Sequence, residues 1–145
     1  MTAKEYLLQY RRLTEKLRAL EADIIEYETI ATNTTQSIDG MPHAHGPSDK
    51  VGSLAVKIAD LKAKKEVVIT EVVTQREEIR SMIDQIGDAR YAKLLSIRYV
   101  ELDSGGRLQT WDNVADQMHM EVSWVKGGLH SQALAAFSEV LARQY

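Results

Sequence analysis

The chain has no cysteine among its 145 residues, which excludes disulfide bonds and thiolate metal sites. Two prolines and eight glycines are few for this length and favour long uninterrupted helices over many short strands. No apolar run approaches the roughly 20 residues of a membrane span. Residues 1–5 also lack the apolar stretch of a signal peptide. We therefore expect an all-α protein of the cytoplasm.

The first segment has the repeat of a coiled coil, because apolar residues alternate at steps of four and three. Charged side chains fill most of the other positions. The spacing predicts a helix over about residues 2–31, roughly 45 Å long at 1.5 Å per residue. Its two seam positions hold Tyr6, Leu13, Leu20 and Tyr27, and Tyr10, Leu17, Ile24 and Ala31.

A second helix is expected over residues 50–86, after a loop at 32–49 that is rich in threonine and contains glycine and proline. Ser48 and Asp49 are suitable capping residues for its start, and Gly87-Asp88 ends it. Lys65 and Gln75 occupy seam positions, where they set the register or lie at the helix edge. The apolar seam residues are Val51, Leu54, Ile58, Leu61, Val68, Val72, Ile79, Met82 and Ile86.

Two long helices joined by a loop fold back as an antiparallel hairpin and bury one seam against the other. Six more apolar residues lie off that seam, and a hairpin alone has no place to bury them. We therefore expect a second contact, most simply in a homodimeric bundle, with residues 1–87 as the oligomerisation domain. The six residues are Ile25, Ile30, Val67, Ile69, Val73 and Ile83.

The segment that follows, 88–145, is predicted to be a small domain that contains a helix-turn-helix. A short helix over 91–100 and a turn over 103–106 lead to Thr110, whose side chain caps the next helix. Two apolar stripes follow, separated by a break at His119-Met120, as in two short helices that cross through a tight turn. The stripes are Trp111, Val114, Ala115 and Met118, then Val122, Val125, Leu129 and Ala133.

The charge of the chain argues against strong non-specific binding to nucleic acid, which depends on phosphate neutralisation. The formal net charge is −3. From residue 110 to the end, two basic residues, Lys126 and Arg143, stand against four acidic ones, Asp112, Asp116, Glu121 and Glu139.

Two sets of residues carry a resemblance to a known family. The first is Ala31-Thr32, Gly40-Met41-Pro42 and residues 48–52; the second is Asp88-Ala89-Arg90, Leu95, Arg98-Tyr99, Thr110-Trp111, Val114-Ala115, Val125, Leu129-His130 and Ala133-Leu134. Over nearly its whole length the chain resembles phage and prophage late-gene transcription regulators, whose C-terminal part is similar to region 4 of sigma-70 factors. This resemblance implies activation of late genes in a bacterial host, by binding promoter DNA with contacts to RNA polymerase.

The chain departs from that family pattern at three places. His119 stands where glycine is usual in the turn, and histidine tolerates left-handed backbone better than most residues. The interval from Val125 to Leu129 is one residue longer than in the family pattern, with Gly127-Gly128 inside it. The arginines that are usual on this helix are largely missing.

The candidate DNA-binding residues lie off the second stripe or just before the helix-turn-helix. Lys126 is expected to bind a phosphate or a guanine edge, while Ser123 and His130 donate hydrogen bonds. Arg98 and Arg107 are expected to hold the phosphate backbone from the side. The full set is Ser123, Trp124, Lys126, Gly127, His130, Arg98 and Arg107.

Other functions remain open at this point. His43 and His45 are too few fixed ligands for a metal site, and no catalytic triad, phosphate-binding loop or carboxylate pair is present, so we expect neither an enzyme nor a cofactor. One alternative is an oligomeric adaptor for DNA packaging, similar to a small terminase. In another, the final helix binds a protein such as RNA polymerase and not DNA.

Overall fold

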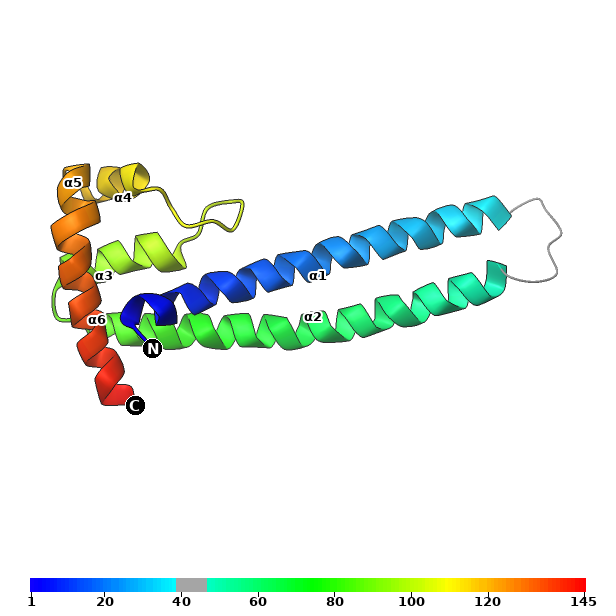
Figure 1. The fold of residues 1–145 in the computed structure, drawn as a ribbon, viewed down its shortest axis with the longest axis horizontal. Helices are drawn as coiled ribbons and strands as arrows, with labels where there is room; N and C mark the ends of the chain where they lie inside the picture. The colour runs from blue at the N-terminus through cyan, green and yellow to red at the C-terminus, as the bar shows by residue number, and fades with distance from the viewer. Residues whose placement is uncertain (39–46) are drawn as a thin grey trace. The chain divides into compact units, whose positions relative to one another are not determined.

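The computed structural model describes residues 1–38 and 47–145, and the side chains of residues 1–33 and 50–145. Within these ranges every regular element is a helix, which confirms the all-α class (Figure 1). The elements are α1 (Ala3–Ile38), α2 (Pro47–Asp84), α3 (Ala89–Leu95), η1 (Ser96–Val100), α4 (Trp111–Met118), α5 (Val122–Trp124), η2 (Val125–Leu129) and α6 (His130–Gln144).

The long helices α1 and α2 run antiparallel, and the predicted seams face inward. All eight seam residues of α1 are buried or half-buried, as are the nine apolar seam residues of α2. Lys65 and Gln75 are half-buried in the same row. The Tyr6 hydroxyl donates to Glu78 at 3.3 Å. These observations confirm the helical hairpin.

Both long helices extend further toward the hairpin turn than predicted, so the loop expected at 32–49 is wrong at both ends. The hydroxyls of Thr29 and Thr32 donate to the carbonyls of Ile25 and Glu28, four residues earlier. These bonds satisfy the threonine side chains inside a helix. At the other end Pro47 fits the first turn, where its missing N–H leaves no bond unmade. Ser48 and Asp49 therefore lie inside α2 and not before it, and His43 and His45 lie outside the described residues.

The chain forms two compact units, and their boundaries differ from the expected division at residue 87. One unit contains residues 16–70, the larger part of both long helices. In it Ile24, Leu61 and Val68 are buried, and Lys62 forms an ion pair with Glu28 at 3.1 Å. The other unit contains residues 1–15 and 71–145, so the ends of α1 and α2 fold together with the C-terminal helices.

One hydrophobic core explains why this second unit includes the ends of the long helices. Tyr6 packs against Phe137 with ring centroids 5.9 Å apart. Ile83, which the hairpin seam left without a partner, is buried in the same cluster. Leu94, Leu95 and Tyr99 of α3 and η1 point inward as predicted. The largest fully buried side chains are Tyr99, Phe137, Leu7, Ile79, Leu94, Leu95, Leu129, Val114, Val125 and Val140.

Five of the six off-seam apolar residues remain exposed, namely Ile25, Ile30, Val67, Ile69 and Val73. The homodimeric contact predicted to bury them stays a prediction.

Among the helices of the described chain, none combines the length and the apolar character that crossing a bilayer requires. No group of three or more potential metal ligands occurs within 1–38 and 47–145.

Candidate nucleic-acid interface

Residues 111–134, which carry the spacing of a helix-turn-helix, form two helices with a turn between them. The Thr110 hydroxyl accepts a hydrogen bond from the Asn113 amide at 3.2 Å and so caps α4. The helix ends at His119, whose φ of 55° and ψ of 43° are left-handed. Among the described residues other than glycine it alone has a positive φ, so the histidine takes the conformation that glycine usually supplies. The chain can then turn sharply into α5.

The second helix of the motif continues without interruption from α5 through η2 and α6, residues 122–144. Within η2 the amide of His130 bonds to the carbonyl of Val125, five residues earlier, so this turn is a π turn. A π turn holds one more residue than an α turn, and such turns are frequent at functional sites. The extra residue noted between Val125 and Leu129 is thus absorbed within the helix, and both side chains remain fully buried.

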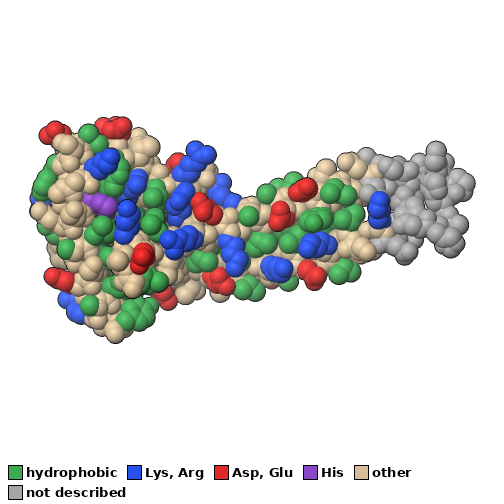
Figure 2. Space-filling model, viewed as in Figure 1, with side chains coloured by type: hydrophobic (Ala, Val, Ile, Leu, Met, Phe, Trp, Pro, Cys, Tyr) green, Lys and Arg blue, Asp and Glu red, His purple; other side chains and the backbone are tan. Residues whose placement is uncertain are grey.

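The face of this helix opposite the buried stripe is open to solvent. Ser123, Lys126 and Gly127 are exposed, and Trp124 keeps 41% of its surface accessible. Ser123 donates to the Glu121 carboxylate at 2.9 Å. Figure 2 shows both basic and acidic side chains at this end of the molecule, the basic ones gathered near its middle and most of the acidic ones toward its outline. Four of the five residues expected to touch nucleic acid from this helix are therefore accessible.

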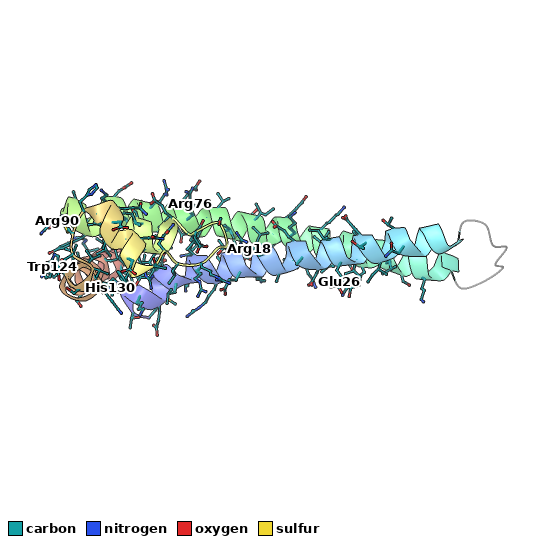
Figure 3. The ribbon with its side chains drawn as sticks, turned by 90° about the horizontal axis from the view of Figure 1, so that it is seen from above. Arg18, Glu26, Arg76, Arg90, Trp124 and His130 are labelled. Atoms are coloured by element: carbon teal, nitrogen blue, oxygen red, sulfur yellow. The ribbon has the colours of Figure 1, made fainter. Side chains whose placement is uncertain are left out.

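The ring of Trp124, which is labelled in Figure 3, occupies the space that a side chain at residue 128 would need. A Cβ atom at residue 128 would overlap this ring, at 2.7 Å from Cε3 and closer still to Cζ3. A Cβ at the neighbouring Gly127 would meet nothing within 4 Å. Gly128 thus leaves room for the exposed Trp124 ring against the helix, while Gly127 has no such role.

This difference gives a matched pair of substitutions. Gly127→Ala should raise the free energy of unfolding by up to about 1 kcal/mol, because alanine favours a helix and the space is empty. Gly128→Ala should displace the indole, which would shift the Trp124 emission and cancel the gain. Urea unfolding followed by tryptophan fluorescence checks both. Equal stabilisation and unchanged spectra in the two variants would contradict the packing of Trp124 on Gly128.

His130 differs from its expected outward position. It is half-buried, its Nε2 shares a hydrogen bond with the Tyr99 hydroxyl at 2.7 Å, and its ring packs edge-on against Trp111 at 4.6 Å. Burial lowers the pKa of His130 to about 4, helped by the positive charges of Lys4 and Arg98. The imidazole is therefore neutral at pH 7 and joins α6 to η1 and α4.

Arg98 is also half-buried and occupied within the protein. Its guanidinium lies 4.3 Å from the centre of the Trp111 ring, and Nη1 donates to the carbonyl of Gln109. Burial lowers the pKa of Arg98, yet an arginine remains charged at neutral pH. It holds the 101–110 loop against η1. Arg107, in contrast, is exposed, and its amide is held by the Asp103 carboxylate at 2.9 Å in the predicted 103–106 turn.

Two further basic residues come close to this group from the start of α1. Lys4 acts electrostatically on His130, and Arg11 acts on Arg98. Arg11 also pairs with Glu15 at 3.0 Å. Periodicity in the sequence placed both residues on the hairpin and gave no sign of this proximity. In the structure Ala3, Tyr6, Leu7 and Tyr10 of the same helix belong to the core that contains Phe137.

The accessible candidate surface therefore consists of Ser123, Trp124, Lys126 and Gly127, with Arg107 on a separate loop. His130 and Arg98 are half-buried and do not belong to this surface, since both pack against the Trp111 ring inside the protein. A comparison of the chain with models of protein families, with characterised proteins and with solved structures found no match.

Proposed function

We propose that the chain is a DNA-binding transcription regulator that contacts duplex DNA through the first turns of the helix over 122–144. The observation that carries this proposal is the two-sided character of that helix. Val125 and Leu129 are fully buried, while Ser123, Trp124 and Lys126 are exposed immediately after the turn. In DNA-binding proteins with this motif, that part of the second helix contacts base edges in the major groove.

The exposed side chains suggest what each contact does. Lys126 supplies a cation for a phosphate or a guanine edge, and Ser123 supplies a hydroxyl. Trp124 supplies a broad apolar surface for a thymine methyl group. Gly127 has no side chain and lets the sugar-phosphate backbone approach closely. Because few cations are present, recognition rests on these contacts more than on charge.

The resemblance described above narrows the proposal to late-gene activation in a phage or prophage. In this role a homodimer carries two reading helices, and DNA recognition recruits RNA polymerase to late promoters. The spacing of two half-sites on the DNA then follows from the geometry of the dimer.

Removal of the Lys126 charge tests the proposal. Lys126→Ala should weaken binding several-fold to promoter fragments taken from the genome that encodes this chain. It should also lower the slope of log K against log salt concentration by about one. Fluorescence anisotropy with labelled duplexes measures both. Arg143→Ala is the matched control, since it removes one exposed cation at the far end of α6.

Comparison of the two variants distinguishes a specific contact of Lys126 from an effect of the overall charge. We expect Arg143→Ala to bind as the parent protein does. Equal losses in both variants would mean that only overall charge matters. No preference of the parent protein for its own promoters over random DNA at low salt would overturn the proposal.

A second candidate function is that the same face binds a protein. Val122 is 37% exposed beside the exposed Trp124, and Glu121 and Asp116 lie nearby in sequence on a surface with one lysine. Apolar residues with acidic neighbours fit a basic protein surface better than a phosphate backbone. Recovery of RNA polymerase by the chain without DNA, lost in Trp124→Ala, would support this function over DNA binding.

A further inference from the structure

Cations from two distant parts of the chain come together around the Trp111 ring. Arg98 of η1 lies 4.3 Å from the centre of this ring, and the ring packs against His130 at 4.6 Å. From α1, Lys4 acts electrostatically on His130, and Arg11 acts on Arg98. The fold explains this proximity, because the first turns of α1 are packed into the core of the same unit. Lys4, Arg11 and Arg98 are called the basic cluster below.

The basic cluster has little negative charge to balance it. Among the side chains that the structure describes, neither Lys4 nor Arg98 forms an ion pair. Arg11 pairs with Glu15, but the two side chains are 36% and 54% exposed, and a pair so open to water holds the arginine weakly. The Nε atoms of Arg11 and Arg98 are buried and have no hydrogen-bond partner in the described chain. Folding therefore brings like charges together, and an anion placed beside them would relieve the repulsion.

Two members of the basic cluster are accessible to such an anion. Lys4 is exposed, and Arg11 keeps part of its side chain in solvent. Arg98 is held by the carbonyl of Gln109 and adds its charge from a half-buried position. Figure 2 shows basic side chains gathered near the middle of this end of the molecule. This gathering does not follow from the overall charge, because residues 1–15 and 71–145 contain slightly more acidic than basic residues.

The basic cluster lies close to the second helix of the helix-turn-helix. His130, on which Lys4 acts, comes four residues after Lys126, about 6 Å further along the same continuous helix. In proteins with this motif the first turns of that helix contact base edges, and neighbouring parts of the protein contact phosphates. The major groove is about 12 Å wide, so a phosphate backbone runs roughly 6 Å from its midline. Lys4 therefore comes within reach of that backbone when Lys126 is in the groove.

We propose that Lys4 and Arg11, at the start of the hairpin, bind the phosphate backbone of duplex DNA beside the groove that the second helix enters, with Arg98 adding its charge. This inference rests on the proposed function for the identity of the ligand. The first turns of α1, which the sequence assigned to oligomerisation alone, then belong to the DNA interface. They supply the cations that residues 110–145 lack, where two basic residues stand against four acidic ones.

Removal of the Lys4 charge tests the proposal. A phosphate contact carries no sequence information, so Lys4→Ala should weaken binding to promoter and to random duplexes by the same factor. The slope of log K against log salt should fall by about 0.9. Between about 50 and 200 mM salt, the parent protein should then lose roughly threefold more affinity than the variant. Fluorescence anisotropy with labelled duplexes measures these values.

Two matched variants control for charge and for side-chain size. Lys4→Arg keeps the cation and should bind as the parent protein does. Arg76→Ala removes an exposed cation from α2 in the same unit, and we expect no effect on binding. Figure 3 labels Arg76 on α2 and His130 near the start of α1. Lys4 and Arg76 are both exposed, so neither alanine variant should fail to fold.

Photo-cross-linking tests the proximity directly, since the chain has no cysteine of its own. Lys4→Cys, labelled with a photoactivatable reagent, should cross-link to a bound duplex at the nucleotides next to those that Lys126 contacts. Arg76→Cys with the same label should not cross-link. Cross-linking that is equal in the two variants would contradict the position of the basic cluster.

The outcomes distinguish this inference from the proposed function. Promoter binding that Lys126→Ala weakens and Lys4→Ala leaves unchanged would overturn the inference alone. Equal binding of promoter and random duplexes, still weakened by Lys4→Ala and not by Arg76→Ala, would overturn the proposed function and support the inference. A loss confined to promoter duplexes, equal losses in Lys4→Ala and Arg76→Ala, or displacement of the duplex by micromolar pyrophosphate, which would indicate a site for a free anion, would each overturn the inference.

Discussion

Val125→Asp is expected to destabilise the unit of residues 1–15 and 71–145 by more than about 4 kcal/mol. Val125 is fully buried in the π turn and belongs to the core that joins α4 to the second helix of the motif. A carboxylate at this buried position loses its hydration and has no ion-pair or hydrogen-bond partner. It also replaces the apolar contacts that the valine methyl groups make in the core. Urea unfolding and near-ultraviolet circular dichroism of the variant measure the loss.

Val122→Asp is the control for that experiment. This residue is three positions earlier on the same helix and remains partly exposed, so its substitution should change stability by less than about 1 kcal/mol. A similar loss of stability in both variants would show that the start of this helix tolerates no added charge, whether the residue is buried or exposed. A folded, cooperative Val125→Asp variant would show that the buried stripe does not hold the helix-turn-helix together.

Acidification is expected to weaken the same unit through His130. Its pKa is lowered to about 4 in the folded protein, against about 6.5 in an unfolded chain. Between these values the unfolded chain binds more protons, so stability is complete above pH 6.5 and falls as the pH drops toward 4. From pH 7 to pH 5 this residue alone should lower the free energy of unfolding by about 2 kcal/mol.

His130→Gln removes the titration and keeps a polar group beside Tyr99. We expect this variant to be less stable than the parent protein at pH 7, and to lose about 2 kcal/mol less between pH 7 and pH 5. His119→Asn, which changes an exposed histidine at a left-handed position, serves as the control. Parallel stability curves for the parent and His130→Gln would contradict a neutral, buried imidazole.

Hydrophobic periodicity predicted the elements of this fold well. The heptad positions identified the buried face of both long helices, even at Lys65 and Gln75, because a coiled-coil repeat has one face at every turn. The stripes at 111–118 and 122–133 identified the helix-turn-helix for the same reason. The break between the stripes at His119-Met120 also predicted the turn after α4, where His119 is left-handed.

Periodicity failed where contacts between distant segments decide the structure. The inclusion of Tyr6 in the core with Phe137 moved the boundary between units, and no local pattern indicated it. His130 points inward because Tyr99, 31 residues earlier, offers a hydrogen bond. The predicted helix ended at residue 31 because a threonine-rich stretch favours a loop, whereas in the structure the Thr32 hydroxyl bonds to a carbonyl of its own helix.

The π turn over Val125–Leu129 has a consequence for the way this surface can change. A π turn holds one residue more than an α turn, so it takes up an added residue between Val125 and Leu129 and leaves both side chains in the core. Loss of that residue would leave an ordinary α turn, with Ser123 and Trp124 still facing solvent. The length of this helix can therefore change by one residue at this point without reorienting the side chains before or after it.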